Sequence, residues 1–222
     1  MRARSFVVAI DGPAASGKGT LARRIAERFA LAHLDTGALY RATAFLVLDQ
    51  AGDPADPIIA AGTARRVDHR LLSDPRLRGE AVAAAASVVA AIPAVRCALL
   101  NWQRDFAAHP PAPAKGAVLD GRDIGSVVCP AADVKLFITA TAEERARRRV
   151  EELRQAGAAA IFKDVLQDMK ERDTRDSERR TAPLGAAPDA VVIDTTTLDA
   201  DTVFDRACVL VKRALKEKEW QQ

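Results

Sequence analysis

Three glycines and a lysine lie close together in residues 9–20, AIDGPAASGKGT, directly after a short apolar run. Gly12, Gly17 and Lys18 fit the pattern G-x-x-x-x-G-K. Glycines tolerate positive φ values and place no Cβ between backbone and ligand, so successive N–H groups can face one anion. A helix that begins in such a loop adds the positive end of its dipole. The pattern predicts that residues 12–20 bind the phosphates of a nucleotide.

Nine consecutive residues are expected to surround these phosphates. They are Gly12, Pro13, Ala14, Ala15, Ser16, Gly17, Lys18, Gly19 and Thr20. Most loops of this type have Ser or Thr directly after the lysine, where the hydroxyl contacts Mg²⁺. Here the hydroxyl comes one position later, so Thr20 is the one candidate contact and no direct metal ligand is assigned. The guanine-recognising motif Asn-Lys-x-Asp is absent, which favours ATP with Mg²⁺ over GTP.

The chain has more cationic residues at the junctions of its predicted strands and helices than a single nucleotide site would need. Arg41 is in the first turns of the second predicted helix, within LDTGALYR. Arg122 and Asp123 follow a predicted strand in LDGRDIG. Ligands of parallel α/β sheets bind at the carboxyl ends of the strands, so these side chains are expected beside the glycine-rich loop. An ATPase needs only one phosphate site, and the extra cations therefore indicate a second anion.

A third group of charges lies in the predicted helix 161–182. Six residues with spacings of 3, 4, 3, 4 and 3 would form one stripe of this helix, namely Phe162, Val165, Met169, Arg172, Asp176 and Arg179. The apolar first half is expected to face the protein. The charged second half, flanked by Arg175, either grips a ligand on the same side or leaves the core and forms solvated ion pairs. The stripe alone does not decide between these alternatives.

Three of the arginines have planar guanidinium groups that can each donate two hydrogen bonds to a phosphate. Arg41, Arg122 and Arg179 could hold a second phosphate opposite the ATP. Asp176 is an acceptor suited to ribose hydroxyls. Together with the glycine-rich loop, these residues point to a small phosphorylated acceptor molecule in addition to ATP.

Short apolar runs alternate with helical patterns along the chain, which predicts an α/β fold with a parallel sheet covered on both faces. The expected strands are 5–10, 117–120, 134–140 and 190–194. The expected helices are the segment after the glycines, 37–52, 56–67, 79–106 with a break at Pro93, 141–157, 161–182 and 199–218. The glycine-rich loop follows the first strand and therefore falls at the edge of the sheet where ligands bind.

The composition excludes several classes of protein. The chain has 222 residues, a net charge of +3 and 5% aromatic residues, which argues against a nucleic-acid or membrane surface. Three cysteines, an odd number, match neither a disulfide framework nor a metal site and fit a reducing compartment. The apolar run at residues 6–10 is too short for a signal peptide. We expect a cytoplasmic monomer with small-molecule partners.

Seven segments together resemble the bacterial cytidylate kinases: GPAASGKGT, LDTGALYRA, SVVAAIPAVR, LDGRDIGSVV, TAEERARRR, KERDTRDSERRTAPL and DTTTL. The resemblance runs from about residue 6 to residue 215. It implies a three-layer P-loop kinase fold in a single domain, residues 1–222, with a nucleoside monophosphate-binding lobe at about 58–106 and a lid at about 150–163. It also implies Mg²⁺-dependent transfer of the ATP γ-phosphoryl group to CMP or dCMP.

The resemblance further implies roles for individual residues. Ser87 and Arg96 would read the cytosine, assisted by Asp123. Arg172 and Asp176 would lie near the ribose. The other substrate-binding residues that it implies are Thr36, Tyr40, Arg41, Arg122 and Arg179, of which the three arginines would hold the acceptor phosphate. The catalytic residues would be Lys18, Arg122 and Arg179.

The chain departs from the family pattern in the predicted lobe, where LLSDPRLRGEAV replaces a longer insertion with a small antiparallel sheet. The lobe that would cover CMP is therefore expected to be shortened, although Ser87 and Arg96 are retained. The arginine-rich helix 143–154 and the loop near Gly157 are the lid candidates. Its four central arginines span too much of the helix for all of them to reach ATP.

Two other functions remain open at this point. One is a P-loop kinase for another small acceptor such as UMP or shikimate, although shikimate carries no phosphate and would not need three convergent arginines. The other is a nucleotide-switched RNA-binding or regulatory protein, which would need a basic face or interleaved aromatic residues. The small net charge and the scarcity of aromatic residues argue against the second.

Overall fold

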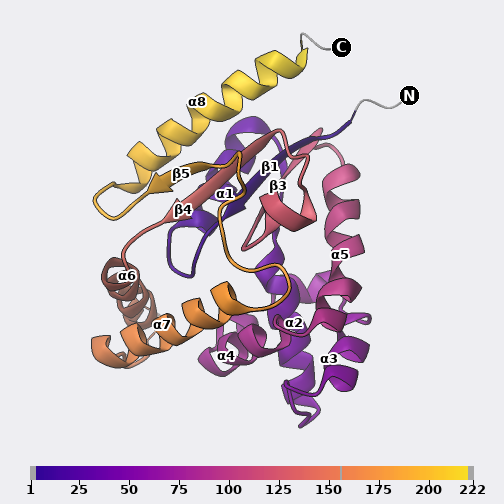
Figure 1. The fold of residues 1–222 in the computed structure, drawn as a ribbon, viewed down its shortest axis with the longest axis vertical. Coiled ribbons are helices and arrows are strands. Elements are labelled where there is room, and N and C mark those ends of the chain that lie inside the picture. Colours follow the sequence, from indigo (N-terminus) through magenta and orange to yellow (C-terminus); the bar gives the residue numbers. More distant parts are fainter. Residues whose placement is uncertain (1–3, 156, 220–222) are drawn as a thin grey trace.

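Five parallel strands form one sheet in the order β2-β3-β1-β4-β5 in the computed structural model, which describes residues 4–155 and 157–219. The strands are β1 (Phe6–Asp11), β2 (Ala32–Asp35), β3 (Gly116–Gly121), β4 (Val134–Thr139) and β5 (Val191–Asp194). Residues 1–3, 156 and 220–222 of the expected domain lie outside the described part. Because β1 is the central strand, the loop that follows it opens at the middle of the sheet edge (Figure 1).

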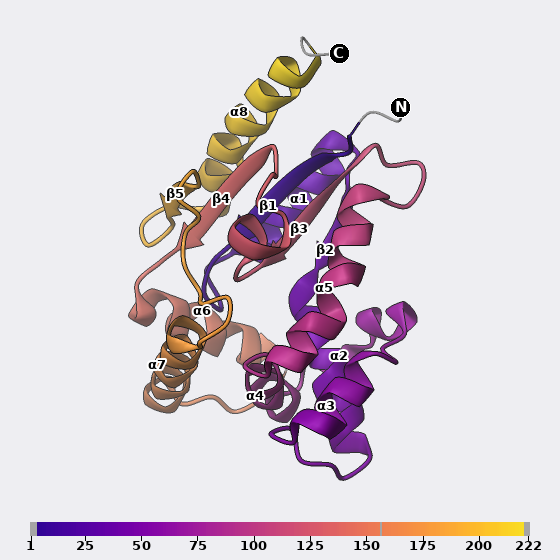
Figure 2. The same cartoon turned by 45° about the vertical axis from the view of Figure 1, so that its right-hand side comes forward.

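Helices cover both faces of the sheet. α1 (Lys18–Phe29) and α8 (Ala200–Glu219) pack on one face, and α5 (Pro93–Ala108) with a π-helical turn, Ile124–Val128, packs on the other (Figure 2). Successive side chains of a strand point to opposite faces. Val8 and Ile10 therefore join the core under α1 and α8, whereas Ala9 joins the core under α5. This alternation gives the three layers that the sequence predicts.

A second apolar core lies among helices beyond the ends of the strands. It joins α2 (Thr36–Asp49), α3 (Pro57–Ala64) and α4 (Glu80–Val89) to α5. Six of its buried residues are alanines, and such small side chains let the helices approach closely. Two 3₁₀ turns, His69–Ser73 and Pro75–Arg78, connect α3 to α4, in the segment where the resemblance predicted a shortened insertion.

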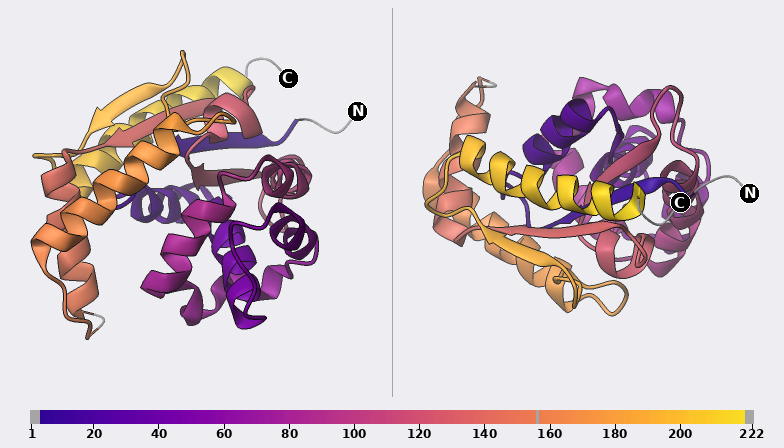
Figure 3. Two further views of the ribbon diagram at one scale, coloured as in Figure 1. Left: turned by 60° about the horizontal axis from the view of Figure 1, so that its bottom comes forward. Right: turned by 90° about the horizontal axis from the view of Figure 1, so that it is seen from above.

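Two more helices stand on the other side of the strand ends. α6 (Ala142–Gln155) packs against α7 (Phe162–Glu178), and the second half of α7 approaches α4 (Figure 3). The carboxyl ends of the strands therefore lie between α2 and α4 on one side and α6 and α7 on the other. Among the helices that are described, no single one is long and apolar enough to cross a membrane, and only the bent pair α4–α5 meets that test by length and composition.

The expected strands and helices are all present within a few residues of their predicted bounds, and the α/β fold with a parallel sheet is confirmed. The sequence did not predict β2 or the π-helical turn. β2 has four residues, of which only Leu34 is buried, while His33 and Asp35 are polar. It lacks an apolar run because it is short and lies at the edge of the sheet, so its pairing with β3 is what defines it.

Gly12, where the loop leaves β1, cannot accept a larger residue. Its φ is 152°, and a Cβ there would lie 2.0 Å from the Ile138 carbonyl oxygen. We expect Gly12→Ala to lower the free energy of unfolding by about 3 kcal/mol, because backbone strain adds to a steric clash. The matched control is Gly62→Ala in α3, where a Cβ meets nothing within 4 Å and should stabilise the helix by up to about 1 kcal/mol. Chemical denaturation measures both, and equal stabilities of Gly12→Ala and wild type would contradict the prediction.

Candidate functional site

A cavity of about 240 Å³ lies at the carboxyl ends of the strands, between the glycine-rich loop, α2, α4 and α7. Its lining is rich in charge. The cationic residues are Lys18, Arg41, Arg96, Arg122, Arg172 and Arg179, and the acidic residues are Asp35, Asp120, Asp123 and Asp176. The cavity is therefore built for an anionic ligand, since its positive groups outnumber its carboxylates.

The glycine-rich loop forms one wall of the cavity. Gly17 has φ 89° and precedes the first residue of α1, Lys18, and Ala15 has φ 55°. The N–H groups in the first turn of a helix have no partners within the helix and attract anions. Four loop residues line the cavity, namely Ala14, Ala15, Lys18 and Gly19. The loop thus presents a helix N-terminus and a lysine to the same space.

Lys18 is surrounded by other charges. Its Nζ donates a hydrogen bond to the Pro13 carbonyl oxygen at 3.2 Å. Burial, together with the nearby positive charge of Arg122, lowers the pKa of Lys18 to about 7, although Asp120 and Asp35 oppose the shift. A phosphate beside the ammonium would reverse the shift by favouring the charged form.

The turn from β2 into α2 positions Arg41. Asp35 caps the helix by accepting a hydrogen bond from the Ala38 N–H at 3.2 Å, and its other oxygen accepts one from Arg41 Nη2 at 2.6 Å. Thr36 Oγ1 donates to the Asp120 carbonyl oxygen at 2.8 Å, which ties this turn to the end of β3. A Cβ at Gly37 would lie 2.9 Å from Arg41 Nη1, so the glycine makes room for the guanidinium.

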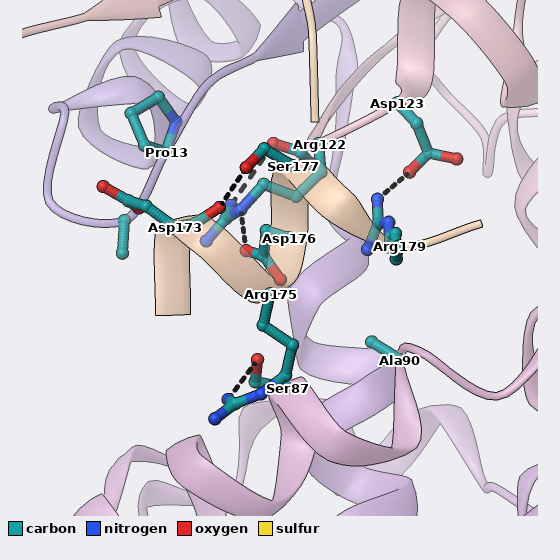
Figure 4. Close-up of polar contacts among 12 residues, drawn as sticks. Pro13, Ser87, Ala90, Arg122, Asp123, Asp173, Arg175, Asp176, Ser177 and Arg179 are labelled. Atoms are coloured by element: carbon teal, nitrogen blue, oxygen red, sulfur yellow. Dashed lines mark hydrogen bonds and ion pairs between the residues drawn. The ribbon is translucent and has the colours of Figure 1, made fainter. Parts of the chain in front are cut away.

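The end of β3 meets α7 through an ion pair. Arg122 Nε donates to Asp176 Oδ2 at 3.0 Å, and both residues line the cavity (Figure 4). Burial opposes ionisation of Asp176, but Arg122 and Arg172 lower its pKa below the usual value. Burial, together with the nearby Arg122, lowers the pKa of Arg172 to about 10. Arg122 and Arg172 therefore crowd each other with like charge, which a bound anion would relieve.

A second network lies deeper, beside α4 and α5. Arg96 Nη2 donates to Asp123 Oδ2 at 2.5 Å, and Arg179 Nη2 is 3.6 Å from Asp123 Oδ1. The Arg96 guanidinium lies 5.5 Å from the centre of the Tyr40 ring. The side chains of Arg96 and Asp123 are 8% and 6% exposed, so this pair is almost completely removed from water.

Three guanidinium nitrogens of cavity-lining arginines are buried without a hydrogen-bond partner among the described residues. They are Arg41 Nε, Arg172 Nε and Arg179 Nη2. Buried donors are rarely left unpaired, because each lost hydrogen bond costs about 1–3 kcal/mol. Their occurrence on three separate arginines around one cavity points to an anionic ligand.

Asp11, which the sequence analysis did not single out, holds the turn that carries Arg122 and Asp123. It ends β1, and its two carboxylate oxygens accept the N–H groups of Ile124 at 2.7 Å and Gly125 at 2.8 Å. Burial raises the pKa of Asp11 to about 6, although these hydrogen bonds oppose the shift. A carboxylate at the end of a buried strand was the available signal, since an unpaired charge is unfavourable there.

The structure brings the two predicted groups of residues together. All ten residues predicted for the acceptor line the cavity: Thr36, Tyr40, Arg41, Ser87, Arg96, Arg122, Asp123, Arg172, Asp176 and Arg179. Gly12, Pro13, Ser16, Gly17 and Thr20 of the predicted loop do not line it. Thr20 is exposed, and its Oγ1 accepts a weak hydrogen bond from Arg23 at 3.4 Å. The roles of all these residues stay predictions.

Several lining residues were missed. Asp35, Gly37, Asp120 and Gly121 lie in the same two strand-end segments as Arg41 and Arg122. The argument that places strand ends at one edge could have included them. Ala86 on α4 and Ala90 directly after that helix carry no chemical signal of their own. They could be found only from their closeness to Ser87 in the sequence.

The predicted stripe on α7 is only partly correct. Its apolar beginning was expected to face the protein, yet Phe162 is 38% exposed, while Asp176 in the charged half is 5% exposed. α7 packs against α6, and the lining of the cavity takes its α7 residues from the second half of the helix, Arg172 and Asp176. The charges therefore do not form a solvated face, and Arg179 lies just beyond the helix end at Glu178.

The arginines of α6 have different environments. Arg145 is 5% exposed, with Nη1 donating to the Ala14 carbonyl oxygen at 3.3 Å and Nη2 to Asp173 at 2.6 Å. Arg148 donates to Thr195 Oγ1 at 2.9 Å and to its carbonyl oxygen at 2.7 Å. These two arginines connect α6 to the glycine-rich loop, to α7 and to the segment after β5.

A glycine-rich loop after the central parallel strand, facing a cluster of buried guanidinium groups, defines a P-loop kinase. The family model of cytidylate kinase matches residues 8–213. Cytidylate kinase from Rhodospirillum rubrum is 55% identical over 91% of this chain and 95% of its own length, and that from Methylobacterium sp. is 58% identical over 93% and 97%. The chain belongs to the cytidylate kinase family.

These matches confirm the resemblance to the cytidylate kinases that the sequence analysis identified. They also confirm that the protein is a phosphotransferase. They do not favour the alternative of a kinase for another acceptor such as UMP. One solved structure, of an uncharacterized protein from Eubacterium ventriosum, is similar with a TM-score of 0.53 and 16% identity. The similarity covers 93% of this chain and 98% of the chain from Eubacterium ventriosum. At 16% identity the similarity supports the fold alone.

The Arg96–Asp123 pair should stabilise the fold as well as the site. Removing one partner of a buried ion pair leaves the other charge uncompensated, so we expect Arg96→Ala to lower the free energy of unfolding by about 3 kcal/mol. The control is Arg70→Ala, which breaks a solvent-exposed pair with Asp68 and should leave stability unchanged. Urea denaturation of the two variants tests this, and an equal effect of both would contradict it.

Proposed function

We propose that the protein transfers the γ-phosphoryl group of ATP to the phosphate of CMP or dCMP, giving ADP and CDP or dCDP. The observation that carries the proposal is the meeting, in one cavity, of the loop lysine with the arginines that have unpaired buried donors. Two phosphates that react must be brought together against their mutual repulsion. Cations on both sides of one cavity suit that task.

On the donor side, the loop and Lys18 would hold the ATP phosphates. Asp35 and Asp120 line the cavity near Lys18 and fit Mg²⁺, which prefers one or two carboxylates together with waters and phosphate oxygens. Mg²⁺ would neutralise phosphate charge there. The described residues include no group of three His, Cys, Asp or Glu side chains that could hold a metal by themselves, so the ion would come with the nucleotide.

On the acceptor side, Arg41, Arg122 and Arg179 would hold the phosphate of CMP. Asp176, next to Arg122, would accept a hydrogen bond from a ribose hydroxyl. Ser87, Arg96 and Asp123 would read the base. Asp123 supplies an acceptor and Arg96 a donor at the deep end of the cavity, which suits a heterocycle with both donors and acceptors on its edge.

The reaction needs no protein nucleophile, because the acceptor phosphate carries its own. Catalysis would come from positioning and from charge stabilisation by Lys18, Arg122 and Arg179. Water must be excluded to prevent ATP hydrolysis. We propose that a lobe at about residues 58–106 and a lid at about 150–163 close over the cavity, and the position of α4 and α6 on opposite sides of the strand ends supports this.

We further propose that the protein is a monomer that acts in pyrimidine nucleotide metabolism in the cytoplasm, with ATP and CMP or dCMP as its partners. The free cysteines Cys97, Cys129 and Cys208 fit a reducing compartment.

A steady-state panel of CMP, dCMP, UMP and AMP with ATP and Mg²⁺ tests the function. We expect the highest kcat/KM with CMP and dCMP. Asp176→Ala should lower kcat/KM for CMP about tenfold more than for dCMP, because only CMP has the 2′-hydroxyl. Equal losses would place Asp176 elsewhere, and a preference of the wild-type enzyme for AMP would contradict the proposed acceptor.

Lys18 should take up a proton when ATP binds. Its pKa of about 7 leaves it mostly neutral above pH 7 in the free enzyme, and neighbouring phosphates would raise that pKa. ATP affinity should therefore fall as the pH rises above 7. Calorimetry at pH 8 in buffers with different ionisation enthalpies should show uptake of nearly one proton. Lys18→Arg stays charged and should show none, and the absence of uptake by the wild type would contradict the prediction.

A further inference from the structure

Arg175 lies among the cavity-lining charges of α7 but contacts a different element. Its Nη1 donates a hydrogen bond to Ser87 Oγ on α4 at 2.9 Å (Figure 4). Its neighbours Arg172 and Asp176 line the cavity, whereas Arg175 is exposed and does not. The contact joins two residues that are 88 positions apart in the sequence. The helices that carry them, α4 and α7, pack against each other.

Ser87 is a buried cavity residue whose hydroxyl can in principle donate or accept. It is 3% exposed. A guanidinium has only donors, so the Ser87 oxygen must accept from Arg175 and keeps its own hydrogen available. Within the described residues this hydrogen makes no bond, not even the back-bond to the carbonyl one turn earlier that serines in helices often form. The hydroxyl therefore has a donor left for the cavity.

We infer that Arg175 is a positioning residue for base recognition, which holds the Ser87 hydroxyl with its hydrogen toward the cavity and holds α4 against α7. The inference rests on the proposed function, because it requires a pyrimidine base beside Ser87. Cytosine and uracil exchange donor and acceptor at N3 and at the substituent on C4. A Ser87 hydroxyl that can only donate a hydrogen bond matches only one of the two bases at a given ring position. A hydroxyl that is free to rotate can donate or accept, and it therefore tolerates both bases.

The position of Arg175 makes this role testable without unfolding the protein. Arg175 is exposed, so its replacement leaves no cavity and no unpaired buried charge. Ser87 keeps its place on α4 but regains rotational freedom. The expected effect is weaker binding of the base, with the phosphate sites unchanged.

The experiment measures KM and kcat for CMP, UMP and ATP in a set of variants. Arg175→Met should raise KM for CMP about fivefold to tenfold and narrow the CMP:UMP ratio of kcat/KM. Because the contact affects substrate binding, kcat and KM for ATP should stay within about twofold. Arg175→Lys, which still donates, should recover part of the loss. Ser87→Ala with Arg175→Met should have the same KM for CMP as Ser87→Ala alone.

Lys170→Met is the charge-matched control. Lys170 also lies on α7, is half exposed and pairs weakly with Glu143 at 3.8 Å, so its loss removes one positive charge without touching Ser87. It should leave all constants unchanged. Wild-type constants for Arg175→Met, an equal rise in KM for ATP, or full additivity with Ser87→Ala would each overturn the inference while CMP kinase activity stands. An inactive wild type with CMP would instead overturn both the proposed function and the inference.

Discussion

Excess positive charge in a small cavity is the constraint on which the rest of this structure depends. Six cationic side chains and four carboxylates line about 240 Å³ at the end of the sheet. Burial and mutual repulsion lower the pKa of Lys18 to about 7 and that of Arg172 to about 10. Such crowding is unfavourable until an anion enters. The scaffold must hold these groups in place, and the ligand then relieves the repulsion.

The scaffold does this by fixing these cations on, or directly next to, regular elements that meet at the carboxyl edge of the sheet. Arg122 follows β3, and the carboxylate of Asp11 at the end of β1 holds the turn beyond it through two backbone N–H groups. Glycines allow the segments to approach closely, as at Gly121, where a Cβ would lie 2.6 Å from Thr36 Oγ1. The ion pairs Arg41–Asp35 and Arg122–Asp176 orient the two guanidinium groups. They leave other guanidinium N–H groups, such as Arg41 Nε, without a hydrogen-bond partner among the described residues.

The sequence predicts the parts of this arrangement that depend on local pattern. The glycine-rich loop and the GRD segment are defined by residue type and by their place after a strand, and the acceptor residues implied by the family resemblance all line the cavity. What the sequence could not predict depends on tertiary packing. Helical spacing relates residues of α7 to one another but not to solvent. The sequence therefore missed the exposure of Phe162, and the stripe alone left open the burial of Asp176. The contact from Arg175 to Ser87 requires two helices to meet.

The central claim is that this charge excess binds the phosphate of the acceptor nucleotide. Titration calorimetry with CMP and with cytidine, in the absence of ATP, tests it directly, because the two ligands differ only in the phosphate. Charge-assisted hydrogen bonds of about 1.5–3 kcal/mol each predict that CMP binds at least about 100-fold more tightly, with a difference that shrinks as salt is added. Equal affinities for CMP and cytidine would contradict the account.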